Sequence, residues 1–192
     1  MKVDLGLYQS KYALRAVLAR LPGLHRLDPN LVSLGALVPS ALAAAALLAG
    51  WWPLIVIGIV GRMLLTTLDG HIAERYGKQT RLGAYLNRAP AEIGDVMLLL
   101  PLLAWAEPAW AAAAIGLAWL VNVFGLLGLV ARGSIQSVGP AGQTDRLVLL
   151  LVASVLATVM PLDWNLVAMA LVGLSVPTLA LRARRSLKEL NL

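Results

Sequence analysis

The sequence predicts an all-α integral membrane protein with six transmembrane helices, an N-terminal amphipathic interfacial helix and both termini in the cytoplasm. Three observations support this fold class: 59% of the 192 residues are hydrophobic, only 14% are charged, and the apolar residues form runs of about bilayer length. A soluble domain is about 45–50% apolar and about 25% charged. The composition therefore excludes an ordinary soluble domain and leaves no room for a sizeable extramembrane one.

Six apolar runs, bounded by glycine, proline, tryptophan and charged residues, are each close to the length of one bilayer crossing. They cover 31–50, 51–69, 84–106, 108–131, 147–162 and 164–182. Tight turns and longer polar segments alternate between them, which indicates two distinct sides. We therefore divide the chain into an amphipathic segment over 1–28 and a single six-helix membrane domain over 29–192.

The positive charges indicate how the helices are oriented. None of the 16 lysines and arginines lies in the three tight turns, so by the positive-inside rule the termini and the two long loops are cytoplasmic. Tryptophans, which favour the membrane interface, gather instead at the tight turns: Trp51, Trp52, Trp105, Trp110 and Trp164. Both signals predict a multi-pass protein of the cell or inner membrane whose active face is cytoplasmic.

The net charge of +6 would suggest a nucleic-acid partner in a soluble protein. Here the positive-inside rule accounts for it, and we expect the lipid bilayer and no nucleic acid as a partner. Residues 5–21 place apolar side chains at helical spacing opposite Lys11 and Arg15, which predicts a helix lying on the cytoplasmic membrane surface. A soluble helix packed on the loops is the alternative. The absence of cysteine excludes disulfides, thiolate chemistry and cysteine-based metal sites.

Ionisable side chains inside an apolar helix bundle are functional candidates by default. In the second run Arg62, Thr66 and Asp69 share one helix face. The third run carries four polar residues in its cytoplasmic half: Asn87, Arg88, Glu92 and Asp95. Acids, an amide, a hydroxyl and an arginine at one depth form a set that suits a metal ion and an anionic diphosphate.

Small residues continue the face of the second helix beyond Asp69. Gly70, Ala73 and Gly77 recur at helical spacing, so that another helix or a phosphate can approach the backbone closely. A structural interpretation stands beside the functional one, because such stripes are common packing seams. In the same way, Arg88 with Glu92 can form an intrahelical pair, and Arg62 with Asp95 a buried structural pair.

A family resemblance comes from the run Asp69-Gly70-His71-Ile72-Ala73, followed after nine further residues by Gly83. This pattern resembles the signature of the CDP-alcohol phosphotransferases, which reads D-x-x-D-G-x-x-A-R, a short spacer, and G-x-x-x-D-x-x-x-D. The segment 28–33 is similar to the T-P-N-x-x-T stretch that opens the first span in that family. The loop 139–146 is similar to its polar fourth-to-fifth loop, so the resemblance extends over most of the chain.

The resemblance implies a membrane enzyme of phospholipid biosynthesis that takes a CDP-linked donor such as CDP-diacylglycerol. Such an enzyme passes a substituted phosphate to an alcohol acceptor and releases CMP. It also implies a divalent metal, Mg²⁺ or Mn²⁺, over the diphosphate, an aspartate as base, and a homodimer. The chemistry is consistent, because a hard cation neutralises charge on the leaving CMP and a carboxylate removes the acceptor proton.

Carried over position by position, the metal-binding aspartates of the signature become Thr66, Asp69 and Asn87. One carboxylate in place of three attracts a divalent ion far less strongly, so we expect weak metal binding, completed by the phosphates of the substrate. The bare helix face and the basic residues around it give the substrate-binding candidates: Arg62, Gly70, Ala73, Arg75 and Gly83. The arginine that follows alanine in the signature is Glu74 here.

The fourth aspartate of the signature, the base, is Ala91 in this chain. Two catalytic candidates remain nearby. Asp95 points in the same direction as Ala91 but lies about 6 Å deeper along the helix. Glu92 points about 100° away unless Pro90 kinks the helix. We favour Asp95.

Three functional hypotheses follow from these observations. The first is an active or divergent CDP-alcohol phosphotransferase, on the motif and the topology. The second is a non-catalytic member of the family that binds a nucleotide or lipid or supports a partner enzyme, on the replaced aspartates. The third is a small transporter, on the polar residues within a helical bundle, although these gather near one face and form no path across.

Overall fold

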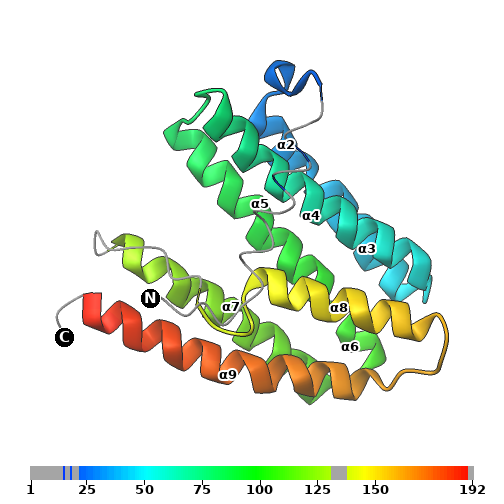
Figure 1. The fold of residues 1–192 in the computed structure, drawn as a ribbon. Helices are drawn as coiled ribbons and strands as arrows, with labels where there is room; N and C mark the ends of the chain where they lie inside the picture. The colour runs from blue at the N-terminus through cyan, green and yellow to red at the C-terminus, as the bar shows by residue number, and fades with distance from the viewer. Residues whose placement is uncertain (1–14, 16–17, 19–21, 131–137, 190–192) are drawn as a thin grey trace. The chain divides into compact units, whose positions relative to one another are not determined.

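The structure, a computed structural model, describes Arg15, Leu18 and residues 22–130 and 138–189. These residues form helices and no strand, which confirms the all-α prediction for the described part of the chain. In chain order the elements, shown in Figure 1, are η2 (Leu24–Arg26), α2 (Pro29–Gly35), α3 (Leu37–Leu48), α4 (Trp52–Arg75), α5 (Arg81–Leu99), α6 (Leu102–Trp105), α7 (Pro108–Val130), α8 (Gln143–Ala157) and α9 (Trp164–Glu189).

The predicted apolar runs coincide with these helices, with two of the runs interrupted. The first run is divided between α2 and α3 at Ala36, and the third continues from α5 into α6. Among the described residues, four helices are long and apolar enough to cross a membrane: Pro29–Leu48, Trp52–Arg75, Pro108–Gly125 and Trp164–Lys188. α5 carries too many charges to qualify, and α8 has only 15 residues.

Several predictions about topology are not tested by this fold. Six crossings, cytoplasmic termini and one membrane domain over 29–192 stay predictions. The amphipathic helix predicted over 5–21 lies outside the described residues, apart from Arg15 and Leu18. The chain separates into two compact units, one of residues 9–101 around α2–α5 and one around α6–α9.

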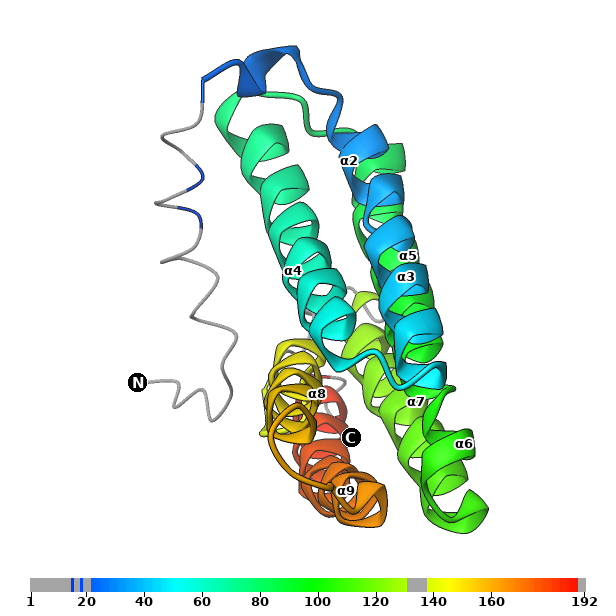
Figure 2. The same cartoon turned by 90° about the vertical axis from the view of Figure 1, so that its right-hand side faces the viewer.

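In the first unit, α2 and α3 pack against both α4 and α5, as Figure 2 shows. Two glycines, which have no side chain, permit this close packing. A Cβ atom on Gly58 of α4 would lie 2.6 Å from the Cβ of Ala43 and 2.8 Å from the carbonyl oxygen of Pro39, both on α3. A Cβ on Gly94 of α5 would lie 2.7 Å from Ser40 Oγ. Glycine is therefore required at Gly58, where α4 meets backbone atoms of α3, and Gly94 leaves room for the Ser40 hydroxyl where α5 meets α3.

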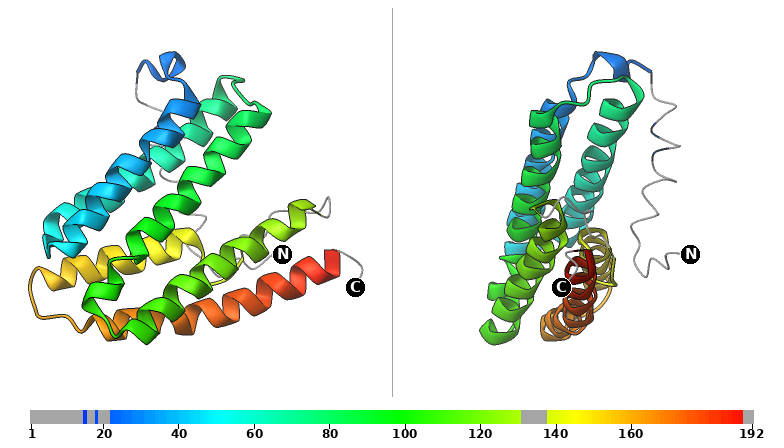
Figure 3. Two further views of the ribbon diagram at one scale, coloured as in Figure 1. Left: turned by 180° about the vertical axis from the view of Figure 1, so that it is seen from behind. Right: turned by 90° about the vertical axis from the view of Figure 1, so that its left-hand side faces the viewer.

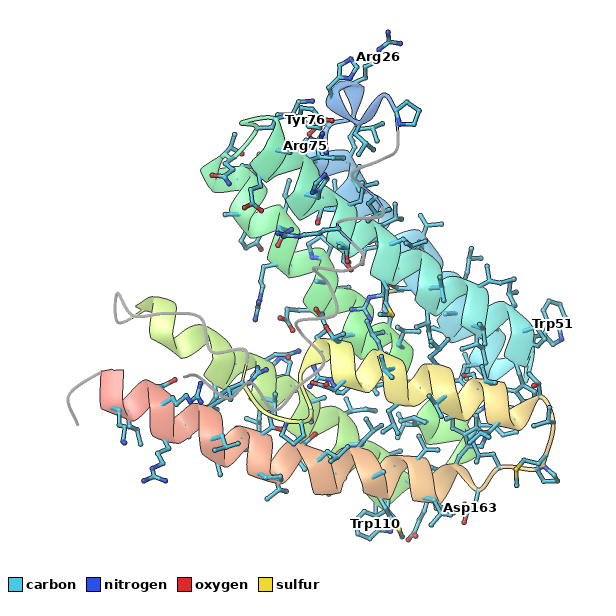
Figure 4. The ribbon with its side chains drawn as sticks, viewed as in Figure 1. Arg26, Trp51, Arg75, Tyr76, Trp110 and Asp163 are labelled. Atoms are coloured by element: carbon cyan, nitrogen blue, oxygen red, sulfur yellow. The ribbon has the colours of Figure 1, made fainter. Side chains whose placement is uncertain are left out.

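The two ends of this unit differ in chemistry. Figure 4 shows Arg26, Arg75 and Tyr76 together at one end and Trp51 at the other, which agrees with the expected separation of basic and tryptophan-bearing turns. At the basic end, Lys78 Nζ donates hydrogen bonds of 2.7 Å to the carbonyl oxygens of both His25 and Leu27. This lysine therefore ties the turn between α4 and α5 to the segment that leads into α2.

The second unit is built on α7 and α9, which lie side by side (Figure 3). Two buried arginines fix the segment before α8. Arg146 donates to Asn122 Oδ1 at 2.8 Å and to the Ala141 carbonyl oxygen at 2.7 Å. Arg182 donates to the carbonyl oxygens of Val138 and Val121 at 3.0 and 2.8 Å. The segment that resembles the polar loop of the family is thus bound to both long helices.

Candidate functional site

The centre of the candidate site is Asp69 on α4, a carboxylate that is only 1% exposed. Its Oδ2 accepts a hydrogen bond of 2.5 Å from Ser33 Oγ on α2, and its Oδ1 accepts one from the backbone N–H of Gly70. A buried carboxylate needs such partners, because burying an unsatisfied charge is very unfavourable. The one aspartate retained from the signature is therefore fixed in position by Ser33 of α2.

The start of α2 explains why Ser33 reaches Asp69. Asp28 is the N-cap of the helix, since its Oδ1 accepts from the backbone N–H of Asn30 at 2.9 Å, and Pro29 occupies the first helical turn. Ser33 follows Pro29 by four residues and also lies 3.0 Å from the Pro29 carbonyl oxygen. A serine hydroxyl has one proton, and the charged carboxylate is the closer and stronger acceptor.

Gly70 and Asn87 bring α4 and α5 together next to this carboxylate. A Cβ atom on Gly70 would lie 3.8 Å from Asn87 Nδ2 and 3.2 Å from Arg15 Nη2. The guanidinium of Arg15 is held there by Glu74, whose Oε2 lies 2.9 Å from Arg15 Nη1. The structure thus places Asn87 of α5 beside Gly70, the residue that follows Asp69 on α4.

Thr66 lies one turn before Asp69 on the same face of α4, half-buried. Its hydroxyl donates to the carbonyl oxygen of Arg62 at 2.9 Å. A threonine oxygen keeps its lone pairs when it donates its proton, so Thr66 still offers a neutral oxygen to a cation. The metal-ligand candidates therefore consist of one buried carboxylate and the neutral oxygens of Thr66 and Asn87.

Deeper in the unit, Arg62 connects α4 to α5. Arg62 and Asp95 are 1% and 2% exposed, and Arg62 Nη1 lies 4.0 Å from Asp95 Oδ1. Arg62 Nη2 donates to the carbonyl oxygen of Ala91 at 2.6 Å, so the guanidinium also binds the α5 backbone one turn above Asp95. A Cβ on Gly94 would lie 3.2 Å from Arg62 Nε, and the missing side chain makes room for the arginine.

The remaining predicted residues lie apart from Asp69 or make contacts of their own. Glu92 Oε1 lies 3.1 Å from Arg88 Nε within α5, as the structural interpretation expects. Arg75 is exposed, with its Cζ 5.8 Å from the ring centroid of Tyr76. A Cβ on Gly83 would lie 3.2 Å from Asn30 Oδ1, which places Gly83 against the start of α2. Ala73 is half-buried on the face that it shares with Gly70.

Two contacts of the site have no counterpart among the sequence candidates. Ser33 occupies the last position of the segment 28–33 that resembles T-P-N-x-x-T, so the sequence carried a signal for it. Arg15 lies outside every recognised motif, and only the structure reveals its contact with Glu74.

A divalent ion fits this site only in part. Among the residues that the structure describes, no group of three or more His, Cys, Asp or Glu side chains is arranged to hold a metal. One carboxylate with hydroxyl and amide oxygens provides hard oxygen ligands but little negative charge. The protein therefore offers a fraction of a coordination shell, which phosphate oxygens of a bound ligand are suited to complete.

Comparisons with known proteins identify the family. The inner membrane protein YnbA of Escherichia coli (strain K12) is 32% identical over 149 residues, 73% of this chain and 74% of that protein. The crystal structure of Mycobacterium tuberculosis phosphatidylinositol phosphate synthase with CDP-DAG bound shares the fold, with a TM-score of 0.74, 19% identity and coverage of 93% of this chain and 94% of that chain. The CDP-alcohol phosphatidyltransferase profile matches residues 26–180. The chain therefore belongs to the CDP-alcohol phosphatidyltransferase family.

Proposed function

We propose that the protein is a membrane phosphotransferase of phospholipid biosynthesis that moves a substituted phosphate from a CDP-linked donor, such as CDP-diacylglycerol, to an alcohol. The observation that carries the proposal is the buried carboxylate of Asp69, held by Ser33 beside Gly70 and Asn87. The family supports the reaction type. The relative with CDP-DAG in its crystal structure supports the class of donor.

Asp69, Thr66 and Asn87 would hold a divalent ion, Mg²⁺ or Mn²⁺, over the diphosphate. Bound there, the ion would neutralise the charge that develops on the CMP leaving group. With one carboxylate available, binding of the ion depends on the phosphates of the donor. We therefore expect the metal and the donor to bind together, each strengthening the binding of the other.

The donor would lie on the bare face of α4. At Gly70 and Ala73 small side chains allow a phosphate to approach the helix backbone. Gly83 permits the close approach of Asn30 at the start of α2. Arg62, one turn below Thr66, places a positive charge beneath the site, and Arg75 adds one at the basic end of the unit.

Asp95 is our candidate for the base, and Glu92 is the alternative. The base would take the proton of the acceptor hydroxyl, whose oxygen then forms the new bond to phosphorus. The bond between that phosphorus and the CMP oxygen breaks, and CMP leaves with the electron pair. Arg62 Nη1 lies 4.0 Å from Asp95 Oδ1 and would orient the carboxylate for this proton transfer.

We further propose that the site faces the cytoplasm, where the basic loops of the chain gather. A homodimer in the bilayer is the assembly that the family resemblance implies. Neither proposal is needed for the chemistry described above. The first concerns the leaflet from which the lipid donor enters, and the second concerns the protein surface against which the helices pack.

The experiment is a CMP-release assay on purified protein with labelled CDP-diacylglycerol, Mg²⁺ or Mn²⁺ and a panel of alcohols. We expect release by the wild type and its loss in Asp69→Asn. Asp163→Asn is the matched control, because Asp163 accepts from the backbone N–H of Asn165 at the start of α9 and asparagine is an equally good cap. No release above background with any alcohol would refute the proposal. Release that is equal in Asp69→Asn would refute the assignment of the site.

Ala91 supports a second candidate, a non-catalytic member of the family that binds a CDP-linked ligand. An alanine occupies the position of the base in the signature, and the nearby Asp95 is engaged by Arg62. This candidate predicts that CDP-diacylglycerol raises the melting temperature while no CMP is released. Asp95→Asn and Glu92→Gln separate the two candidates. These substitutions should reduce CMP release if the protein is an enzyme, whereas a non-catalytic member releases no CMP with or without them.

A further inference from the structure

Arg15 lies at the candidate site although it is far from the motif in sequence. Its Nη1 donates a hydrogen bond of 2.9 Å to Glu74 Oε2. Its Nη2 lies 3.2 Å from the point that a Cβ atom on Gly70 would occupy, and the same point is 3.8 Å from Asn87 Nδ2. The guanidinium therefore lies against Gly70 on α4, close to a point that the amide of Asn87 also approaches.

Glu74 explains how Arg15 is held there. Gly70 and Glu74 are one turn apart on α4, so a fork-shaped guanidinium can bind the carboxylate with one terminal nitrogen and reach the backbone at Gly70 with the other. An ion pair of this exposure, with 32% and 65% of the two side chains accessible, contributes little to stability by itself.

We propose that Arg15 is a positioning and specificity-determining residue for the diphosphate of the CDP-linked donor. The proposal rests on the function proposed above. A phosphate that lies against Gly70 would be within reach of both the guanidinium of Arg15 and the amide of Asn87. Arg15 would then supply a charge-assisted hydrogen bond to the diphosphate, while Glu74 orients it. The signature places an arginine where this chain has Glu74, and here the cation reaches the same turn of α4 from the N-terminal segment.

The test compares the dissociation constants of CDP-diacylglycerol and cytidine, in detergent with Mg²⁺, for the wild type and four variants: Arg15→Gln, Arg15→Lys, Glu74→Gln and Arg26→Gln. We expect Arg15→Gln to weaken the binding of CDP-diacylglycerol by about tenfold or more. Cytidine has no phosphate, and its binding should not change. Arg26→Gln removes the same charge from an exposed position at the basic end, and its affinity should stay within about twofold of the wild type.

Glu74→Gln separates a ligand contact from a structural ion pair. If Arg15 binds the diphosphate, removal of Glu74 loosens the orientation of the guanidinium but keeps its positive charge, and the affinity for CDP-diacylglycerol should fall by less than about threefold. If the pair serves only the fold, Arg15→Gln and Glu74→Gln should weaken binding equally, and that result would overturn the proposal. Arg15→Lys keeps the positive charge but loses the forked guanidinium, so its affinity for CDP-diacylglycerol should lie between those of the wild type and Arg15→Gln.

Two further outcomes distinguish the failure of this proposal from that of the proposed function. Wild-type protein that does not bind CDP-diacylglycerol would refute both. Binding by the wild type that is lost in Asp69→Asn but unchanged in Arg15→Gln would refute the role of Arg15 alone. Melting temperatures check the fold, and we expect Arg15→Gln to melt within about 4 °C of the wild type because the ion pair is exposed.

Discussion

The hydrogen bond between Ser33 and Asp69 allows a quantitative prediction. Ser33→Ala removes the hydroxyl that donates to the buried carboxylate across 2.5 Å and puts nothing polar in its place. A hydrogen bond to a charged group contributes about 1.5–3 kcal/mol. For a chain of this length, 1 kcal/mol shifts the melting temperature by about 2–4 °C. We therefore expect Ser33→Ala to melt about 3–12 °C below the wild type.

Ser40→Ala is the matched control for this measurement. Ser40 is also buried and lies seven residues after Ser33. Its Oγ donates to the carbonyl oxygen of Ala36, one helical turn earlier, at 2.7 Å. Loss of that neutral bond is offset by the higher helix propensity of alanine, so we expect a shift of about 2 °C or less. Thermal unfolding in detergent, followed by circular dichroism, measures both variants. Equal shifts for the two would refute the claim that Ser33 stabilises a buried charge.

Four glycine substitutions, two in each unit, test the packing within each unit by the same unfolding measurement. Gly58→Ala places a methyl group 2.6 Å from the Cβ of Ala43 and should destabilise the protein by about 1–3 kcal/mol. Its control is Gly61→Ala, whose new methyl group would lie 3.4 Å from its nearest neighbour, and this variant should be neutral or stabilised by up to about 1 kcal/mol. Gly139→Ala combines a φ of 111° with a contact of 2.5 Å to a side-chain methyl of Thr178, so we expect a loss of about 1–3 kcal/mol. Gly173→Ala on α9 meets nothing within 4 Å and should not destabilise; destabilisation as large as that of Gly139→Ala would contradict the described geometry.

The sequence predicted the helices well because the apolar runs are long and their boundaries are marked by proline, glycine and charge. Trp52–Arg75 and Trp164–Glu189 correspond closely to the expected second and sixth runs, each extended at its C-terminal end. The interruptions were harder to foresee. The division at Ala36 falls within the first expected run, between Gly35 and Pro39, and periodicity does not distinguish one such helix from two.

The site was predicted in part, and the reason for the difference is physical. Residues close in sequence on one helix face, such as Thr66, Asp69 and Gly70, can be placed from helical spacing alone. Contacts between distant segments depend on how the helices pack, and no spacing rule predicts them. This is why the partnership of Ser33 with Asp69 became visible only in the structure, as did that of Arg15 with Glu74.

The central claim is that Asp69 holds a metal ion together with the diphosphate of a CDP-linked ligand. Electron paramagnetic resonance of Mn²⁺ tests this claim most directly, because it separates free from bound ion without requiring turnover. We predict little bound Mn²⁺ with protein alone, a clear bound fraction after addition of CDP-diacylglycerol, and loss of that fraction in Asp69→Asn but not in Asp163→Asn. Equal Mn²⁺ binding by Asp69→Asn and the wild type in the presence of CDP-diacylglycerol would contradict it.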